Sequence, residues 1–280
     1  MAQDYAEAFK WYHKAAEQEH AHAQYQLGYF YLKGWGVAQD HAEAFKWYSK
    51  ASDQGNVYAQ YSLGVMHDEG LGVAQDRAEA VKWYRKAADQ GHAKAQFSLG
   101  FMYGNGQGVA QDHAEAVKWY RKAAEQGHLH AQFNLGIRYS NGRGVAQDHA
   151  EAFKWYRKAA DQGHPKPQYY LGGMYDNGDG VTQDRAEAVK WYSKAAEQGH
   201  DGAQTNLGFM YGTGRGVIQD YVYAHMWSNI AASQGNEQAR KNRDLSAKRM
   251  TPSQLETAQR LARDFVPRKA AAPKNIAKRG

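Results

Sequence analysis

The chain has 280 residues, a formal net charge of +6, no cysteine and a mean hydropathy of −0.84. This composition excludes a disulfide framework and thiolate metal sites, and no apolar run approaches the ~18 residues that a membrane-spanning helix requires. The first residues are polar and do not resemble a signal peptide. The sequence as given indicates a cytoplasmic protein; a periplasmic or secreted location stays open if an upstream signal segment precedes it.

The sequence repeats itself with a period of 36 residues. A Gln-Asp pair begins at Gln3 and returns in register until Asp220, and tryptophan recurs seven times in the same register from Trp11 to Trp227. Only Trp35 lies off the period. A regular period of this length indicates an array of similar units, because one unit is too small to bury its apolar side and must stack on its neighbours.

The first helix of each unit begins with an acidic pattern, which the second unit shows as Asp40 and Glu43. This spacing is typical of a capping box, in which Asp accepts from a first-turn N–H and Glu bonds back to the N–H of Asp. Six units carry the pattern, and the seventh, from Asp220 to Tyr223, has lost it. A glycine such as Gly55 follows the helix and predicts a left-handed residue that ends it.

The second helix of each unit begins near a histidine or asparagine and contains a Leu-Gly pair, such as Leu63-Gly64. A row of histidines suggests a metal array, but packed helices lie about 8–10 Å apart whereas zinc requires nitrogens about 2.1 Å from the ion. We therefore interpret the histidines as residues that open the second helix. The recurring glycine costs about 1 kcal/mol in a helix and indicates two closely packed backbones. No metal site is predicted.

The full unit reads A-x-K-W-Y-x-K-A-A-x-Q-G-x-x-x-A-Q-x-x-L-G-x-x-Y-x-x-G-x-G-V. This signature resembles the Sel-one-like repeat (SLR) family, a relative of the tetratricopeptide repeat, with six units over residues 1–219 and a divergent seventh over 220–250. The resemblance implies an all-α fold, a right-handed α/α superhelical solenoid of helix-turn-helix repeats. It also implies a bacterial, non-enzymatic adaptor that binds a peptide or protein partner in signalling, the envelope or host interaction.

The two ends of the array carry separate expectations. A capping helix is predicted over 251–267, because Thr251, Pro252 and Gln254 supply start signals for an amphipathic segment, and a disordered basic tail is predicted over 268–280. Met1 occupies the position of the linker valine in the other units, so the first unit lacks its upstream linker and a cap. We expect either a longer array or self-association through this end.

The positive charge is concentrated at one end of the chain. Residues 220–280 contain 12 Lys and Arg against 5 Asp and Glu, whereas the preceding repeats are close to neutral. A solenoid that follows a phosphate backbone should be basic along its length. Nucleic-acid or anionic-surface binding through the basic C-terminal region is therefore the alternative function, and a protein partner is the leading one.

Positions that vary from unit to unit are the candidates for partner contact. On the first helix these are His13, Arg85, Arg121 and Arg157, a stripe suited to carboxylates, with pairing to acidic residues at i+4 as the open alternative. On the second helix they are Tyr58, Lys94 and His130. At the loop tips they are Trp35 and Leu71, whose apolar side chains indicate a neighbour contact or an interface.

Nothing in the sequence indicates catalysis. The carboxylates are mostly capping residues that recur every 36 positions, and no nucleophile stands with a matched base. A hydrolase would require a residue that we are unable to name. We therefore predict no enzyme activity, no cofactor and no small-molecule substrate.

Overall fold

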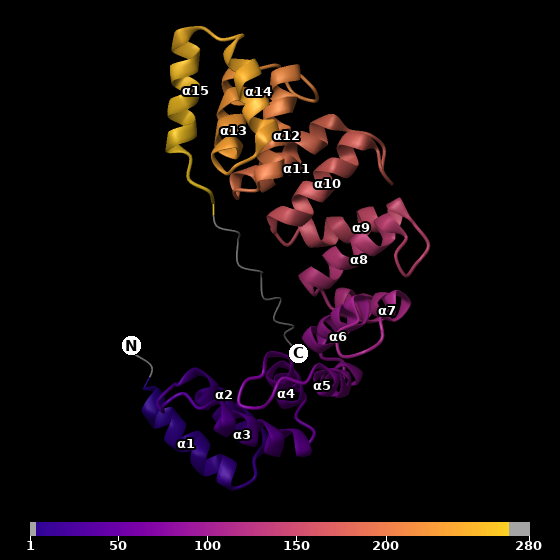
Figure 1. Ribbon diagram of the computed structural model, residues 1–280, viewed down its shortest axis with the longest axis vertical. Coiled ribbons are helices and arrows are strands. Elements are labelled where there is room, and N and C mark those ends of the chain that lie inside the picture. The colour runs from indigo at the N-terminus through magenta and orange to yellow at the C-terminus, as the bar shows by residue number, and fades with distance from the viewer. Residues whose placement is uncertain (1–3, 269–280) are drawn as a thin grey trace, which may run out of the picture. The chain divides into compact units, whose positions relative to one another are not determined.

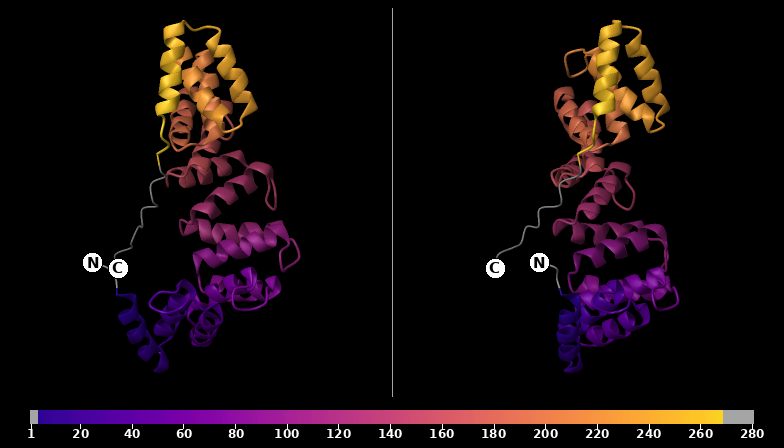
Figure 2. Two further views of the ribbon diagram at one scale, coloured as in Figure 1. Left: turned by 60° about the vertical axis from the view of Figure 1, so that its left-hand side comes forward. Right: turned by 90° about the vertical axis from the view of Figure 1, so that its left-hand side faces the viewer.

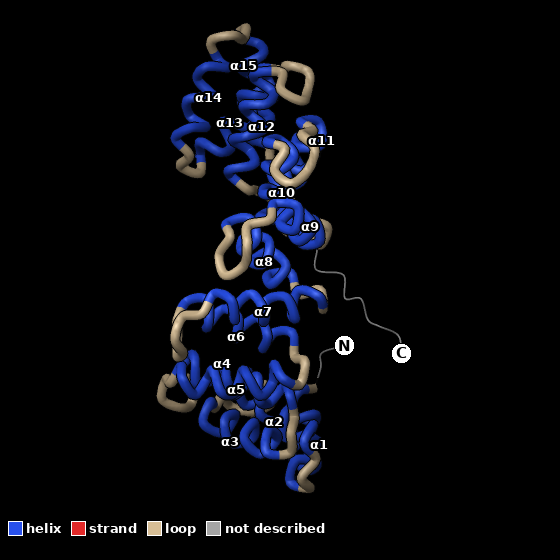
Figure 3. Tube along the Cα trace, turned by 90° about the vertical axis from the view of Figure 1, so that its right-hand side faces the viewer, coloured by secondary structure: helices blue, strands red, loops and turns tan. Residues whose placement is uncertain are grey.

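A computed structural model describes residues 4–268, and all of its regular structure is α-helical (Figure 3). None of the described helices has the length and apolar character needed to cross a membrane. Apart from Arg268, the basic tail predicted over 268–280 lies outside the described residues.

Fourteen of the helices form seven hairpins, and a single helix follows them (Figure 1). The first helices of the hairpins are α1 (Tyr5–Glu17), α3 (His41–Asp53), α5 (Arg77–Asp89), α7 (His113–Glu125), α9 (His149–Ala160), α11 (Arg185–Glu197) and α13 (Tyr221–Ser233). The second helices are α2 (Ala21–Lys33), α4 (Val57–Glu69), α6 (Ala93–Asn105), α8 (Leu129–Asn141), α10 (Pro165–Asn177), α12 (Asp201–Thr213) and α14 (Glu237–Ala247). The last helix is α15 (Pro252–Asp264). The helix-turn-helix repeat with its 36-residue period is confirmed.

The chain divides into two compact units, Met1–Ala131 with Arg143–Val145, and Gln132–Gly142 with Ala146–Gly280. In the first unit, α2 packs on α3, α4 on α5 and α6 on α7. In the second, α10 packs on α11 and α12 on α13, while α15 lies beside α13 (Figure 2). Each hairpin within a unit is therefore buried by the next one, as expected for a solenoid.

Of the two hydrogen bonds in the predicted capping box, only the one accepted by the Asp side chain is formed. The side chain of Asp40 accepts from the N–H of Glu43 at 3.0 Å, and Asp220 keeps a cap on Val222 and Tyr223 although Tyr223 replaces the Glu of the other units. The return bond from Glu is not formed, because the N–H of Asp40 already donates to the carbonyl of Tyr31 at 3.0 Å. The capping box is thus replaced by an aspartate cap that joins two hairpins.

The released glutamates take other partners. Glu43 pairs with Lys46 at 2.6 Å, and Glu115 accepts from the indole N–H of Trp119 at 2.9 Å while it pairs with Lys118. These contacts, between residues three or four positions apart, stabilise the first helices by a few tenths of a kcal/mol each.

The stop signals after the first helices are confirmed. Gly55 has φ +82°, and an added Cβ would meet nothing within 4 Å, so the backbone angle alone requires glycine there. In the first hairpin, Glu19 takes the same left-handed conformation with φ +62°, although it is not a glycine. That hairpin therefore carries backbone strain that the others lack.

The glycine of the Leu-Gly pair makes room for a ring as well as for backbone. A Cβ on Gly100 would lie 2.8 Å from Cδ1 of Tyr120 and 3.2 Å from the carbonyl oxygen of Ala116, both on the next hairpin. The prediction of two close backbones therefore omitted the tyrosine that fills most of the space. In the seventh hairpin Ser228 replaces this tyrosine over Gly208.

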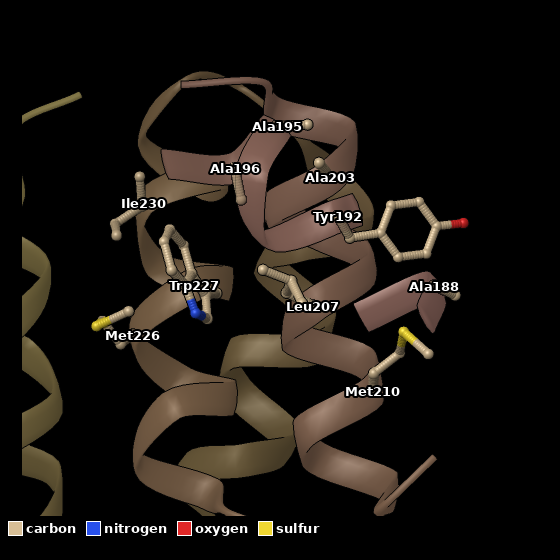
Figure 4. Close-up of a cluster of buried hydrophobic side chains, with 10 residues drawn as sticks. All are labelled: Ala188, Tyr192, Ala195, Ala196, Ala203, Leu207, Met210, Met226, Trp227 and Ile230. Atoms are coloured by element: carbon tan, nitrogen blue, oxygen red, sulfur yellow. The ribbon is translucent and has the colours of Figure 1, made fainter. Parts of the chain in front are cut away.

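The core is built from small and large residues of consecutive helices. In the second unit, Trp227 and Ile230 of α13 face Leu207 of α12, beside the alanines of α11 (Figure 4). Equivalent clusters lie in the first unit around Leu63 and Leu99, which are fully buried.

Pairs of glutamines join consecutive hairpins, a contact that the sequence analysis missed. The buried Gln96 donates to the carbonyl of Ala88 at 3.1 Å and accepts from Gln126, thirty residues later, at 2.7 Å. The same Gln–Gln bond recurs at 24/54, 60/90, 132/162, 168/198 and 204/234. Since a buried amide without partners is destabilising, these pairs fix how one hairpin sits on the next.

Candidate functional site

Four of the repeated histidines cap the second helices with their side chains, as interpreted from the sequence, whereas the side chain of His20 makes no capping bond. Nδ1 of His128 accepts from the N–H of Ala131 at 3.3 Å, and the same contact forms at His92 and His200. Asn56 fills the position with its side-chain oxygen at 3.0 Å. Within residues 4–268 no three histidine or acidic side chains come together in a way that could hold a metal ion.

These histidines also stack on aromatic rings of the preceding hairpin. The ring of His128 lies 4.8 Å from that of Phe97, and His200 lies 4.6 Å from Tyr169. Burial lowers the pKa of His128 to about 4, with smaller contributions from His130, Lys94 and His92. The neutral imidazole is therefore the form that caps and stacks near pH 7.

The arginines of the first helices pack against aromatic residues. Arg85 bonds to the hydroxyl of Tyr103, and its guanidinium lies 5.8 Å from the ring centre of Trp119 on the next hairpin. Arg157 lies 5.0 Å from the ring centre of Trp191. These two arginines are half-buried, so much of their side chains serves the contact between hairpins.

Arg157 also pairs with Asp161 at 3.2 Å, which is the i+4 alternative expected from the sequence. Of the two remaining first-helix candidates, Arg121 is exposed on α7. His13 of α1 lies 3.5 Å from Glu17 and 5.9 Å from the ring of Trp47.

Two of the loop tips pack on the first helix of their own hairpin. Trp35 stacks on Tyr5 with ring centres 4.7 Å apart, and Arg143, at the same repeat position, bonds to His113 at 2.9 Å. Trp35 is therefore held by neighbour contacts, one of the two interpretations that the sequence left open. Leu71 instead turns toward the second helices, where it packs beside the core around Leu63.

Two of the three second-helix candidates and the loop residue Leu71 meet in a groove of about 800 Å³ in the first unit. Helices α2, α4 and α6 and the loop after α4 form it, and Tyr58, Lys94 and Leu71 are among its lining residues. His130 lies outside that lining, with the centre of its ring 5.9 Å from the centre of the Phe97 ring. The structure thus brings together three of the nine predicted contact residues, from two consecutive hairpins.

Tyrosines form most of the groove's aromatic surface. Tyr25, Tyr29, Tyr48 and Tyr61 line it, and the ring of Tyr58 lies 5.7 Å from that of Tyr25. Tyr58 is 53% exposed, an unusual value for an aromatic residue on a packed helix. Burial raises the pKa of Tyr25 and Tyr61 above the usual range, so both hydroxyls stay protonated and can donate hydrogen bonds.

The groove also carries polar groups at one end. Lys94 is exposed there, next to His92, whose pKa is lowered by burial and then by Lys94. The amides of Gln90 and Gln126 complete this end. The groove therefore combines an aromatic lining with one exposed cation and several polar side chains.

Tyr25, Tyr48 and Tyr61 were missed because aromatic residues recur at their repeat positions. An aromatic residue holds the position of Tyr25 in five hairpins, and the sequence analysis assigned recurring residues to the scaffold. The signal that could have indicated the groove lies at two variable positions of α4. Tyr58 adds a further ring there, and the small Ser62 leaves space beside it.

The family model of the Sel1 repeat matches the chain seven times, at residues 1–20, 21–56, 57–92, 93–128, 129–164, 168–200 and 202–236. No protein with a curated functional description matches it.

Several solved structures are similar to this chain. A Sel1 repeat protein from Oxalobacter formigenes is 38% identical over 83% of this chain and 96% of its own, with a TM-score of 0.71. A protective antigen of uropathogenic Escherichia coli with an SLR fold is 33% identical over 95% of this chain and 73% of its own, with a TM-score of 0.43. An immunity protein from Pseudomonas aeruginosa is 21% identical over 78% of this chain and 83% of its own, with a TM-score of 0.42.

Proteins of this kind are generally non-catalytic scaffolds for protein interaction. With seven matched repeats and seven helical hairpins of the same period, the chain belongs to the Sel1 repeat family.

Proposed function

We propose that this protein is an adaptor that binds an extended segment of a partner protein in the tyrosine groove of α2, α4 and α6. The observation that supports this proposal is the groove itself, in which the exposed Tyr58, the loop residue Leu71 and the cation Lys94 converge from two consecutive hairpins. Packing against neighbouring helices holds the tyrosine rings Tyr25, Tyr48 and Tyr61, so little entropy of these side chains is lost when a ligand binds.

The lining defines the chemistry of the ligand. Tyrosine rings suit the flat, apolar face of proline and aliphatic side chains in an extended chain. Lys94 at the end of the groove suits a carboxylate, from an acidic side chain or from a chain terminus. The proposed ligand is therefore an extended, proline-containing or aliphatic segment with an acidic group at one end.

A displayed library of random extended peptides tests this proposal. Peptides enriched on the native chain should share apolar residues followed by an acidic one. They should lose about tenfold or more in affinity for Tyr58→Ser and for Lys94→Glu. Lys166→Glu is the matched control, because Lys166 has the repeat position of Lys94 in α10 of the other unit.

Two results would contradict the proposal. In the first, the enriched peptides bind Tyr58→Ser and Lys94→Glu as tightly as the native chain. In the second, the control loses as much affinity as Lys94→Glu. Thermal unfolding of each variant should precede the binding measurement, so that a folding defect is not read as lost binding.

Binding of nucleic acid or an anionic surface through the C-terminal region remains the alternative. Several cations of that region are already paired, with Arg240 on Glu237, Arg243 on Asp244 and Arg268 on Glu197. Deleting residues 269–280 should leave peptide binding unchanged. If that deletion instead removes a salt-dependent affinity for nucleic acid, the result favours nucleic-acid binding over the adaptor function.

A further inference from the structure

The last described residues show how this array holds an extended segment. After α15, the chain runs back toward α11, and the ring of Phe265 meets Trp227 edge-on with centres 5.4 Å apart. The N–H of Arg268 donates to the carbonyl of Glu197 at 2.8 Å, and its guanidinium pairs with the Glu197 carboxylate at 2.8 Å.

Between these two contacts, Pro267 covers the glycine that ends α11. A Cβ on Gly199 would lie 3.5 Å from Cβ of Pro267. The segment Phe-Val-Pro-Arg therefore binds a first-helix end through a ring, a proline and a cation.

The array side of this groove recurs at the start of the chain. The groove between α11 and α13 is lined by Gly199, Ile230, Ser233 and Gln234, together with Phe265 and Pro267. The groove between α1 and α3 is lined at the same repeat positions by Glu19, Lys50, Asp53 and Gln54. It has a volume of about 650 Å³, and all its lining residues belong to the first two hairpins.

A single repeat position explains why the grooves differ along the array. Where arginine holds it, as at Arg85, the side chain lies over the tryptophan of the next hairpin. The sixth hairpin has Ser193 there, and Phe265 contacts the tryptophan instead. The first hairpin has His13, which leaves Trp47 half-buried and the groove open.

The charge of the open groove fits the same kind of segment. Glu17 has the repeat position of Glu197, which binds Arg268, and Glu19 and Asp53 add two further carboxylates. Lys50 and His13 are the basic groups on the lining. The open groove is thus more acidic than the occupied one, where Gly199 and Ser233 stand at those two positions.

From this equivalence we propose that the α1/α3 groove is a second peptide site, which binds a partner segment with the pattern aromatic–x–Pro–Arg. The aromatic ring packs on Trp47, the proline covers the turn at Glu19, and the arginine pairs with Glu17. This site lies on the first helices and is independent of the tyrosine groove, which takes an acidic ligand.

A synthetic peptide with the sequence of residues 262–268, Ala-Arg-Asp-Phe-Val-Pro-Arg, is the probe. Titration calorimetry with the full chain should detect binding, and His13→Arg and Glu17→Lys should each weaken it about tenfold or more. His13→Arg places in α1 the residue that three interior hairpins carry, so it should fold with an unchanged thermal midpoint.

Glu125→Lys is the matched control, because Glu125 has the repeat position of Glu17 on α7 and its hairpin carries Arg121. Tyr58→Ser should also bind the peptide normally, which separates this site from the tyrosine groove. Replacing the Phe or the final Arg of the peptide by Ala should abolish binding.

Three outcomes would overturn the proposal. The peptide could fail to bind the native chain at millimolar concentration, or bind His13→Arg and Glu17→Lys without loss. In the third, sedimentation shows a concentration-dependent dimer that Phe265→Ala dissociates. The occupant is then the same segment of a second copy instead of a partner.

Discussion

Trp11 of the first hairpin and Trp119 of the fourth have the same repeat position and the same contacts within their own helices. Each indole N–H donates to the glutamate four residues earlier, and each ring carries the lysine three residues later. Yet Trp11 is 63% exposed and Trp119 only 4%. The difference comes from the preceding hairpin, whose Arg85 covers Trp119, and no hairpin precedes α1 within the described residues.

The comparison shows that a residue of this array acquires its environment from a neighbouring hairpin. Identical sequence positions therefore differ in what they contribute to stability, as expected when each unit contacts only the next. The following predictions test that conclusion.

The largest effect is expected at the tryptophans. Trp119→Ala removes a buried ring and should lower the free energy of unfolding by about 3–5 kcal/mol. Trp11→Ala should lower it by less than about 1 kcal/mol, because little surface is lost. Urea denaturation followed by circular dichroism measures both. Equal losses would contradict the role of the neighbouring hairpin.

Replacing either of two adjacent glycines of α10 by alanine should change the stability of the protein in opposite directions. A Cβ on Gly172 would lie 2.7 Å from Cδ1 of Tyr192, so Gly172→Ala should destabilise the protein by about 1–3 kcal/mol. The nearest atom to a Cβ on Gly173 is the Tyr192 hydroxyl at 3.5 Å. Gly173→Ala should therefore stabilise the helix by up to about 1 kcal/mol. Thermal unfolding of the pair separates ring contact from helix propensity, and destabilisation by both would refute the distinction.

Acid should weaken the stacked histidine caps. The pKa of His128 falls from its usual 6.5 to about 4 on folding, so its contribution is complete above pH 6.5 and is lost as the pH falls toward 4. His128→Asn keeps a capping oxygen without a titrating ring, and its stability should vary less over this range. His20→Asn is the control, since the side chain of His20 makes no capping bond. The measurement is unfolding by urea at several pH values, and parallel profiles for the native chain and His128→Asn would exclude this cap as a source of acid sensitivity.

The smallest effect is expected at the end of α1. Glu19→Gly should raise the free energy of unfolding by about 1 kcal/mol, because glycine adopts φ +62° without steric strain. Gly127→Ala, at the same position of an interior hairpin, should lower it by a similar amount, since φ is +86° and an added Cβ meets nothing within 4 Å. Thermal midpoints report both changes; no gain from Glu19→Gly would mean that the strain is relieved elsewhere.

Local patterns in the sequence were sufficient for the helices and their ends. The period, the aspartate caps, the left-handed glycines and the histidine caps all depend on residues within a few positions of one another, such as Asp40 with Glu43. The one local error, the return bond of the capping box, arose because the N–H of Asp40 is used by Tyr31 of the preceding helix.

The candidate sites depended on contacts that local patterns do not contain. Tyr58, Leu71 and Lys94 were chosen because they vary, but only packing places them in one groove and leaves His130 outside its lining. Arg85 was chosen for the same reason, but in the folded chain its guanidinium packs over the ring of Trp119.

The sequence by itself determined the repeat, its helices and the family, because hydrogen bonds within a turn and the 36-residue period are properties of nearby residues. The tertiary structure alone decided which glutamines pair, which tryptophans are covered and where Phe265 and Arg268 bind. Those contacts join residues 30 or more positions apart, and their geometry is set only when one hairpin packs on the next.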